Sequence, residues 1–302
     1  MSKIQELKEV YRAVFAEDDG RYIDYVFGRK YSEENAIWHE EGGRIVSHLF
    51  YVDRKLKIRG KAIDCPYIVA VGTLPEYRRR GFAELLMYRC FEELKGKGYA
   101  LCALHPFRHS FYQKFGFVTY IKVRVHTISF SGEDGFDLAD IGEGDMLLVK
   151  RLYDSFMAPY SGYAVRDLEE TRRRFEEFKS YSSCKFILKE GKPIGYVYFD
   201  DGFAEEYCGP WQAVDRIAGL NGRKVCLPID SSLGEPTDFT MLKVLDRGRL
   251  LAIFGNDALL GALSDEQLVR ALTGSWGQFG TELPEAVAGK YFNLTNFVFD
   301  KY

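Results

Sequence analysis

Three consecutive arginines and a glycine stand in a short segment, residues 78–83 (RRRGFA), between two regular elements. The apolar residues 69–73 before it have the pattern of a strand, and helical periodicity follows it. Such a turn binds anions, because the first amides of a helix have no intrahelical acceptor and lie at the positive end of its dipole. Gly81 and the small Ala83 would let a phosphate approach the backbone. The segment therefore predicts a phosphate site, and the alternative is a solvated basic patch.

The elements around this turn form a recognisable order. Residues 36–73 read as an antiparallel meander of strands, residues 83–97 as a helix that ends at glycines, and residues 99–104 as a further strand. A strand, a turn, a helix and a strand in this order predict a βαβ crossover. The sequence has no GxGxxG fingerprint, and no Gly-Lys-Ser/Thr follows the turn, so neither a dinucleotide site nor a P-loop is predicted.

Beyond residue 125 the pattern of the sequence changes. Helical stretches around residues 145–156 and 167–178 and a hairpin at residues 186–199 predict a second α+β unit, in which residues 211–220 are a helix. Past Pro236, a strand at residues 239–245 and a helix that starts at the capping box Ser264 predict a third. The predicted domains are residues 1–125, 126–235 and 236–302.

Two stretches resemble a known family. Residues 75–83 (PEYRRRGFA) look like motif A of the GCN5-related N-acetyltransferases (GNAT), whose signature Arg/Gln-x-x-Gly-x-Gly/Ala is matched by Arg78, Gly81 and Ala83. Residues 103–117 (ALHPFRHSFYQKFGF) resemble a signature of the Eis-type (enhanced intracellular survival) branch. The resemblance implies a GNAT fold, a mixed and mostly antiparallel sheet with flanking helices. A reduced second GNAT-like unit and a small α+β unit like sterol carrier protein would follow it.

The resemblance also implies a cofactor and the residues that hold it. Acetyl-CoA would be the co-substrate, with no metal ion, and Tyr112 would take the position of the general acid. In the Eis-type branch the terminal carboxylate, here that of Tyr302, reaches the active site, where it would be the base. The residues implied to contact the cofactor are Val71, Gly72, Thr73, Arg78, Arg79, Arg80, Gly81, Phe82, Ala83, Glu84, Phe107 and Arg108.

The chemistry of acetyl transfer suits these positions. A tyrosine hydroxyl is protonated at neutral pH and can protonate a departing thiolate, and backbone amides at residues 71–73 could stabilise the oxyanion. Tyr112 also lies in an aromatic run that could simply pack the sheet, and the end of the chain could be an ordinary strand. His105, His109 and Cys102 are not expected to be catalytic.

The acceptor is expected to be the primary amine of a small cationic molecule. Asp18, Asp19, Asp24, Glu40 and Glu41 could form an anionic rim for it, although acidic loop residues are usually just solvated. Two alternatives stay open: a noncatalytic protein that binds or senses acyl-CoA, and an enzyme that acetylates proteins or peptides.

Composition excludes several partners. The chain has 302 residues, 41 basic and 44 acidic, so it carries no global positive field for nucleic acid or a membrane. Its six cysteines form no CxxC pair or metal-ligand cluster, which predicts neither zinc nor a disulfide framework. The polar amino terminus has no apolar signal core, so a cytoplasmic protein is expected. A homo-oligomer is left open.

Overall fold

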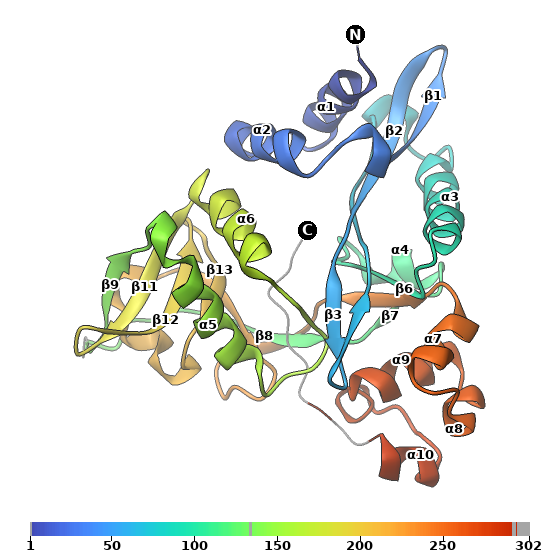
Figure 1. Cartoon of the computed structure of the whole chain (residues 1–302). Helices are drawn as coiled ribbons and strands as arrows, with labels where there is room; N and C mark the ends of the chain where they lie inside the picture. The colour runs from blue at the N-terminus through green and yellow to red at the C-terminus, as the bar shows by residue number, and fades with distance from the viewer. Residues whose placement is uncertain (1, 133–134, 292–293, 295–302) are drawn as a thin grey trace.

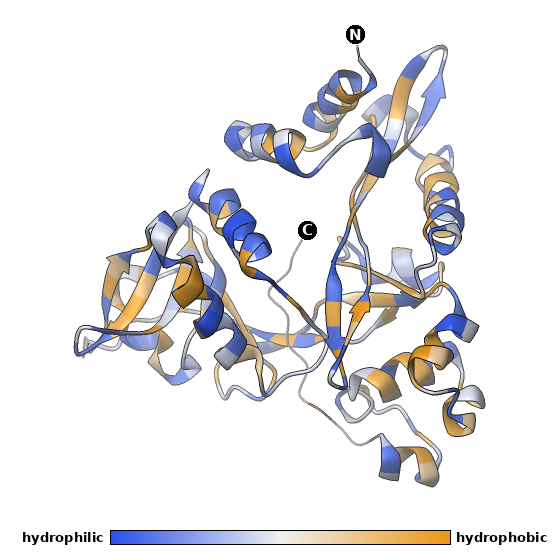
Figure 2. Cartoon of the chain, viewed as in Figure 1, coloured by the Kyte–Doolittle hydropathy of each residue, from blue (hydrophilic) through white to orange (hydrophobic). Residues whose placement is uncertain are grey.

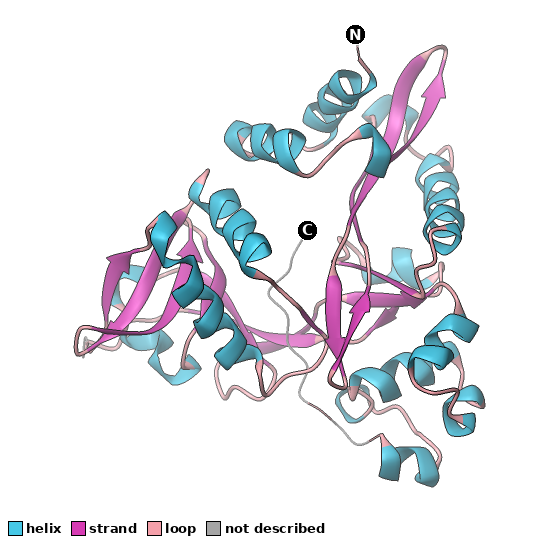
Figure 3. Cartoon of the chain, viewed as in Figure 1, coloured by secondary structure: helices cyan, strands magenta, loops and turns pink. Residues whose placement is uncertain are grey.

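The computed structural model describes residues 2–132, 135–291 and 294. Helices flank three β-sheets, and the strands run mainly antiparallel (Figures 1 and 3). The α-helices are α1 (Lys3–Val14), α2 (Gly20–Arg29), α3 (Phe82–Gly96), α4 (His109–Gln113), α5 (Met146–Met157), α6 (Leu168–Lys179), α7 (Arg247–Ile253), α8 (Ala258–Gly261), α9 (Asp265–Thr273) and α10 (Glu285–Lys290). Within the described residues no helix is long and apolar enough to cross a membrane.

The first sheet has the strand order β1-β2-β5-β6-β16-β7. Its strands are β1 (Ala36–Glu41), β2 (Arg44–Val52), β5 (Tyr67–Thr73), β6 (Leu101–Leu104), β7 (Val118–Thr119) and β16 (Met241–Val244). β5 and β6 are parallel and α3 connects them, which confirms the βαβ crossover. α3 buries Leu86, Met87 and Leu94 in a cluster with the strands, as its alternation of hydrophobic and hydrophilic residues requires (Figure 2).

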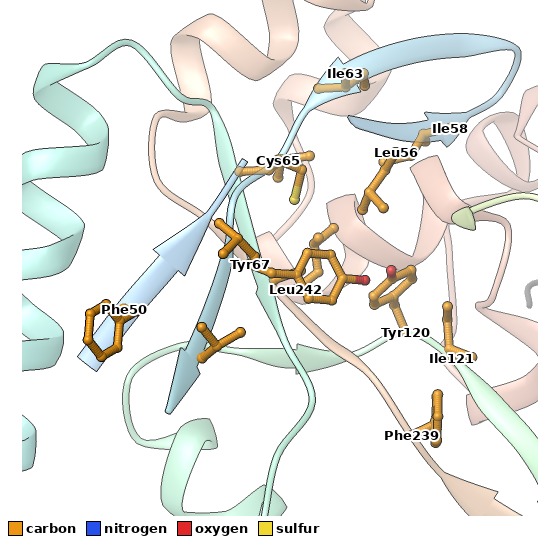
Figure 4. Close-up of a cluster of buried hydrophobic side chains, with 14 of the residues drawn as sticks. Phe50, Leu56, Ile58, Ile63, Cys65, Tyr67, Tyr120, Ile121, Phe239 and Leu242 are labelled. Atoms are coloured by element: carbon orange, nitrogen blue, oxygen red, sulfur yellow. The ribbon is translucent and has the colours of Figure 1, made fainter. Parts of the chain in front are cut away.

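The predicted meander is wrong in one respect. β2 pairs directly with β5, and the segment between them leaves the sheet as a hairpin of β3 (Lys55–Ile58) and β4 (Lys61–Asp64). This hairpin pairs with β10 (Tyr163–Ala164). It leaves because its apolar side chains Leu56 and Ile63 are buried in a cluster with Tyr67 and Tyr120 (Figure 4).

The second sheet has the order β15-β8-β14-β13-β12-β11-β9. Its strands are β8 (Lys122–Thr127), β9 (Asp137–Asp140), β11 (Ser183–Lys189), β12 (Lys192–Phe199), β13 (Phe203–Cys208), β14 (Lys224–Pro228) and β15 (Glu235–Asp238). The predicted hairpin is β11 and β12, and the predicted helices are α5 and α6. Residues 211–220 form two 3₁₀ helices instead of one α-helix, because Ile217 between them has extended backbone at φ −112 and ψ 96.

Three strands conflict with the predicted domain boundaries, and one of them, β15 of the second sheet, spans the boundary at residue 235. β8 spans residue 125, and β16 comes from the segment predicted as a third unit yet lies between β6 and β7 in the first sheet. Met241 and Leu242 of β16 are buried there, so the first sheet is completed by a distant part of the chain. The division into three domains stays a prediction.

Candidate active site

The edge of β5 opens at the centre of the first sheet. β5 and β6 are paired at Tyr67 and Ala103, and beyond this point β5 pairs only with β2. A bulge interrupts that second pairing, and Ala70 in it has φ 51. A positive φ is rare for a residue other than glycine and is typical of functional sites, where the surrounding structure enforces it. Residues 70–73 therefore face an opening between two splayed strands.

The predicted phosphate turn lies next to this opening. Gly81 is the N-cap of α3 with φ 83, and Arg79 has φ 64. No side chain caps the helix at Gly81, so the first amides of α3 remain available to an anion. Apart from its chain neighbours, no described residue has an atom within 4 Å of the place where a Cβ on Gly81 would stand, which leaves room above the turn.

A cavity of about 740 Å³, the turn cavity, joins the opening and the turn. Eleven of the twelve residues implied to contact the cofactor line it, and they come from β5, the turn, the start of α3 and the loop before α4. Arg80 is the exception: it does not line the turn cavity, and its guanidinium lies 5.0 Å from the centroid of the Tyr77 ring. The lining residues from that set are Val71, Gly72, Thr73, Arg78, Arg79, Gly81, Phe82, Ala83, Glu84, Phe107 and Arg108.

Positive charge prevails in the turn cavity. Arg78, Arg79 and Arg108 are exposed on its wall, and Arg78 donates a hydrogen bond from Nε to the carbonyl oxygen of Thr73 at 3.2 Å. The carboxylate of Glu84 is paired with Lys114 at 2.8 Å, so it does not offset the arginines. The turn cavity can therefore hold a multiply charged anion.

A second cavity of about 550 Å³, the acidic cavity, adjoins the first and shares with it Phe15, Glu17, Val71 and Phe107. Among the residues that the structure describes, six carboxylates and one arginine, Arg174, line it. Three of these carboxylates come from the loop between α1 and α2. The other three come from α6, from the residue after β12 and from β13. These six residues are Glu17, Asp18, Asp19, Glu177, Asp200 and Glu205.

The predicted anionic rim is thus partly wrong. Asp18 and Asp19 line the acidic cavity, but Asp24, Glu40 and Glu41 do not. Asp24 forms ion pairs with Lys8 and Arg12, Glu40 pairs with Lys3 at 2.7 Å, and Glu41 contacts His39. The sequence did not predict the other four carboxylates: Glu17 has no motif that distinguishes it from a solvated loop residue, and Glu177, Asp200 and Glu205 are brought here by α6 and the second sheet, far along the chain.

Tyr112 stands where the two cavities meet. It lines the acidic cavity beside Val71 and Phe107, both of which line the turn cavity as well. Its ring is 4% exposed and packs edge-on against Phe107, Phe111 and Phe117. Burial raises the pKa of Tyr112, so the hydroxyl stays protonated at neutral pH. Phe107 beside it is 69% exposed, an unusual state for a large apolar side chain.

Other titratable groups near the opening have packing partners. His48 on β2 is fully buried, its ring is stacked on Tyr11, and burial lowers its pKa to about 4. Tyr11 donates a hydrogen bond to Asp18 at 2.6 Å, and burial raises the pKa of that carboxyl group. His105 lines the acidic cavity, while Cys102 is buried in the core. The predicted base, Tyr302, lies outside the described residues.

The amino-terminal part of the chain matches a known protein family. Residues 1–119 match the family model of the acetyltransferase (GNAT) domain. This part of the chain is thus similar to a GNAT acetyltransferase domain. It contains the turn, α3, the splayed strands and Tyr112. No curated protein sequence matches the chain.

Solved structures resemble the chain along its whole length. A GCN5-related N-acetyltransferase from Anabaena variabilis has a TM-score of 0.71 at 17% identity, over 100% of this chain and 98% of that one. One from Kribbella flavida has a TM-score of 0.67 at 16% identity, over 99% and 96%. Eis1 from Mycobacterium abscessus has a TM-score of 0.66 at 13% identity, over 100% and 98%. At these identities the likeness shows the fold, and it confirms the predicted α+β architecture.

Proposed function

We propose that the chain is an acetyl-CoA-dependent N-acetyltransferase that acetylates a primary amine of a small cationic molecule. One observation carries the proposal: in a chain with a GNAT-like domain, a cationic cavity and an anionic cavity meet at the open edge of β5, beside Tyr112. The first has the charge to bind a phosphorylated cofactor, and the second has the charge to bind an amine.

The turn cavity would hold coenzyme A in an extended arrangement. The pyrophosphate would lie on the amides of Phe82, Ala83 and Glu84, with Arg78 and Arg79 beside it. The pantetheine arm would follow the open edge of β5 at residues 71–73 and cover the exposed ring of Phe107. This path brings the thioester to the junction of the two cavities.

Transfer would then be direct. The neutral amine attacks the thioester carbonyl carbon, the new C–N bond forms, and a backbone amide of the β5 bulge stabilises the oxyanion. As the C–S bond breaks, Tyr112 gives its proton to the departing sulfur. Because the pKa of Tyr112 is raised, its proton is transferred late in the cleavage of the C–S bond, when the sulfur has gained most of its negative charge.

The acidic cavity sets the class of acceptor. The attacking amine must be neutral, so six carboxylates are explained best by a second, protonated amine elsewhere on the acceptor. The aromatic rings of Tyr22, Phe178 and Tyr181 in the same wall suit a cation on an aliphatic chain. We therefore expect diamines or polyamines to react faster than neutral monoamines.

Calorimetry with coenzyme A and mass spectrometry of amine products test the proposal. We expect the wild-type chain to bind coenzyme A and the double variant Arg78→Gln/Arg79→Gln to bind it at least tenfold more weakly. With acetyl-CoA and a panel of amines, we expect product on dicationic acceptors. Binding without product on any amine would favour the noncatalytic sensor, product on peptides alone would favour a protein acetyltransferase, and absence of binding would end the proposal.

Proton removal from the amine is assigned to the carboxylate of Tyr302, as the Eis-type resemblance implies. Adding several residues after Tyr302 would displace that carboxylate while leaving the turn cavity intact. We expect such an extension to lower turnover strongly and to leave coenzyme A affinity unchanged. Full turnover in the extended chain would exclude this role. The sterol-carrier-like nature of residues 236–302 and the cytoplasmic location stay predictions.

A further inference from the structure

The six carboxylates of the acidic cavity differ in the partners that they have within the chain. Glu177 of α6 is paired with Lys30 at 2.6 Å and with Arg174 at 3.4 Å, so its charge is compensated. Glu205 of β13 interacts within the chain as well. These two carboxylates therefore have partners without a ligand.

Two further carboxylates hold the backbone in place. Asp200 accepts hydrogen bonds from the backbone N–H groups of Gly202 at 2.8 Å and Phe203 at 2.7 Å, between β12 and β13. Asp19 is the N-cap of α2 and accepts from the backbone N–H of Arg21 at 2.7 Å. The guanidinium of Arg21 also donates to both carboxylate oxygens of Asp19, at 3.2 Å each. Both carboxylates thus have a role in local structure.

Glu17 and Asp18 remain, and they differ in burial. Among the described residues, no basic side chain pairs with either carboxylate. Glu17 is exposed, so water screens its charge, whereas Asp18 is half-buried and burial raises its pKa. A charge that is partly removed from water is unfavourable unless an opposite charge compensates it. A cation from outside the chain is therefore bound best at Asp18.

Tyr11 orients the carboxylate of Asp18. The hydroxyl of Tyr11 donates a hydrogen bond to Oδ2 at 2.6 Å, and no described residue donates to Oδ1. A neutral hydroxyl fixes the carboxylate but does not neutralise it. The ring of Tyr11 packs against Phe15, with centroids 4.7 Å apart, and Phe15 lines both cavities. Asp18 is thus attached to the junction of the cavities and keeps one oxygen for a ligand.

The aromatic wall of the acidic cavity suits an ammonium group on an aliphatic chain. The rings of Tyr22 and Tyr181 lie edge to face with centroids 5.5 Å apart, and Phe178 lies 5.5 Å from Tyr181. Aromatic faces attract cations and pack against methylene groups. The cavity therefore offers negative charge and apolar contact to the same ligand.

The hydroxyl of Tyr112 is independent evidence of a ligand in this cavity. Tyr112 is 4% exposed and lines the cavity, and no described residue forms a hydrogen bond with its hydroxyl. Buried hydroxyl groups in proteins nearly always have a partner. A ligand that reaches Tyr112 would supply one.

We propose that Asp18 binds the second ammonium group of the acceptor and thereby selects diamines and polyamines. This inference rests on the proposed function, in which the reacting amine lies neutral at the junction. The second ammonium group donates to Oδ1 of Asp18, while Tyr11 keeps Oδ2. The aliphatic chain of the acceptor lies along the aromatic wall and leads to Tyr112. Asp18 positions the acceptor and takes no part in the chemical step.

Titration calorimetry of the free protein at pH 7 tests this site, with the linear diamine putrescine as the probe. We expect saturable binding to the wild-type chain and binding about tenfold weaker or more in Asp18→Asn. Asparagine removes the charge and keeps an oxygen that accepts from Tyr11, so the variant should fold, which urea unfolding checks.

Two variants that each remove one negative charge are the controls. Asp24→Asn changes a nearby carboxylate that does not line the acidic cavity and is paired with Lys8 and Arg12, so it should leave binding unchanged. Glu17→Gln should weaken binding by roughly threefold at most, because Glu17 is exposed. Absence of binding to the wild-type chain, equal affinity in Asp18→Asn, or an equal loss in either control would each overturn the proposal.

Kinetics distinguish a failure of this inference from a failure of the proposed function. With acetyl-CoA, we expect Asp18→Asn to lower the ratio of kcat/KM for putrescine to kcat/KM for butylamine, the monoamine of the same chain length, about tenfold or more. An unchanged ratio would exclude the role of Asp18 and leave the acetyltransferase in place. Putrescine binding that depends on Asp18, without acetylation of any amine, would support the ammonium site and contradict the acetyltransferase.

Discussion

Burial sets the chemistry that Tyr112 can perform. The ring is enclosed by Phe107, Phe111 and Phe117, and its raised pKa keeps the hydroxyl neutral. A neutral phenol can donate a proton but cannot act as a base near pH 7. Tyr112 is therefore suited to protonate the departing sulfur, and another group must accept the proton of the amine.

Tyr112→Phe isolates this role, because the ring stays in its aromatic cluster and only the hydroxyl is lost. We expect kcat to fall by roughly 10² to 10⁴, the usual loss of a general acid, while coenzyme A affinity stays the same. Tyr120→Phe is the matched control, since Tyr120 is buried outside both cavities. If Tyr112→Phe turns over like the control, the acid role is excluded.

His48 should make the stability of the fold sensitive to mild acid. Its pKa is about 4 in the folded chain and 6.5 in the unfolded chain, so between these values the unfolded state binds more protons. The contribution of His48 to the free energy of unfolding is therefore complete above pH 6.5. It is lost as the pH falls toward 4, by about 3 kcal/mol in all. Urea unfolding of the wild type and of His48→Phe at pH 4.5, 5.5 and 6.5 measures it. Parallel pH slopes for the two chains would contradict the prediction.

At the scale of elements, two backbone strains frame the cofactor path. Ala70 at φ 51 shapes the bulge of β5, and Arg79 at φ 64 shapes the turn before α3. Each stands two residues before a glycine. A Cβ on Gly72 would come within 2.8 Å of Val14 Cγ1, whereas Gly81 has a positive φ and open space around it. The local geometry of the site thus depends on the backbone more than on side-chain contacts.

Gly81→Ala should weaken coenzyme A binding for this reason. The added methyl group meets no atom of the protein, but φ 83 is unfavourable for alanine, so the turn shifts or the fold loses about 1 kcal/mol. Gly96→Ala, in the same helix with equal free space and no positive φ, should keep binding and gain slight stability. Calorimetry and urea unfolding of both variants check this. Equal coenzyme A affinity in the two variants would show that the turn does not hold the cofactor.

The sequence predicts the elements whose determining residues lie close together in the chain. It fails where an element pairs with a distant segment. The crossover, the turn at Gly81 and the capped helix at Ser264 follow from glycine, periodicity and capping within a few residues of each other. The placement of β16 in the first sheet depends on pairing with β6, which no local pattern records. The same holds for Glu177, whose role in a cavity wall depends on the docking of a second unit.

At the scale of the whole molecule, a buried ion pair joins the two units beside the acidic cavity. Lys30 follows α2 of the GNAT-like domain and contacts Glu177 of α6. Burial alone would raise the pKa of Glu177, but Lys30 and Arg174 outweigh burial and hold the pKa below its usual range. The pair therefore stays ionised, and it holds in place a carboxylate that lines the acidic cavity.

Removing one partner of this pair should destabilise the chain strongly. Lys30→Met leaves part of the charge of Glu177 uncompensated, and Glu177→Gln does the same to Lys30, so each should cost about 3 kcal/mol in urea unfolding. The double variant should cost less than the two single changes together, with a coupling energy of about 1–3 kcal/mol. The size of the coupling measures how firmly the units are docked.

Lys3 and Glu40 provide the matched comparison, because they form a pair of nearly the same length, 2.7 Å, with both side chains more than a third exposed. Solvent screens such a pair, so the cycle of Lys3→Met and Glu40→Gln should give a much smaller coupling energy than the cycle of Lys30 and Glu177. If Lys30 and Glu177 couple no more strongly than this exposed pair, they do not hold the units together. Glu177 and α6 could then move relative to α2, and a contact of another carboxylate would have to maintain the shape of the acidic cavity.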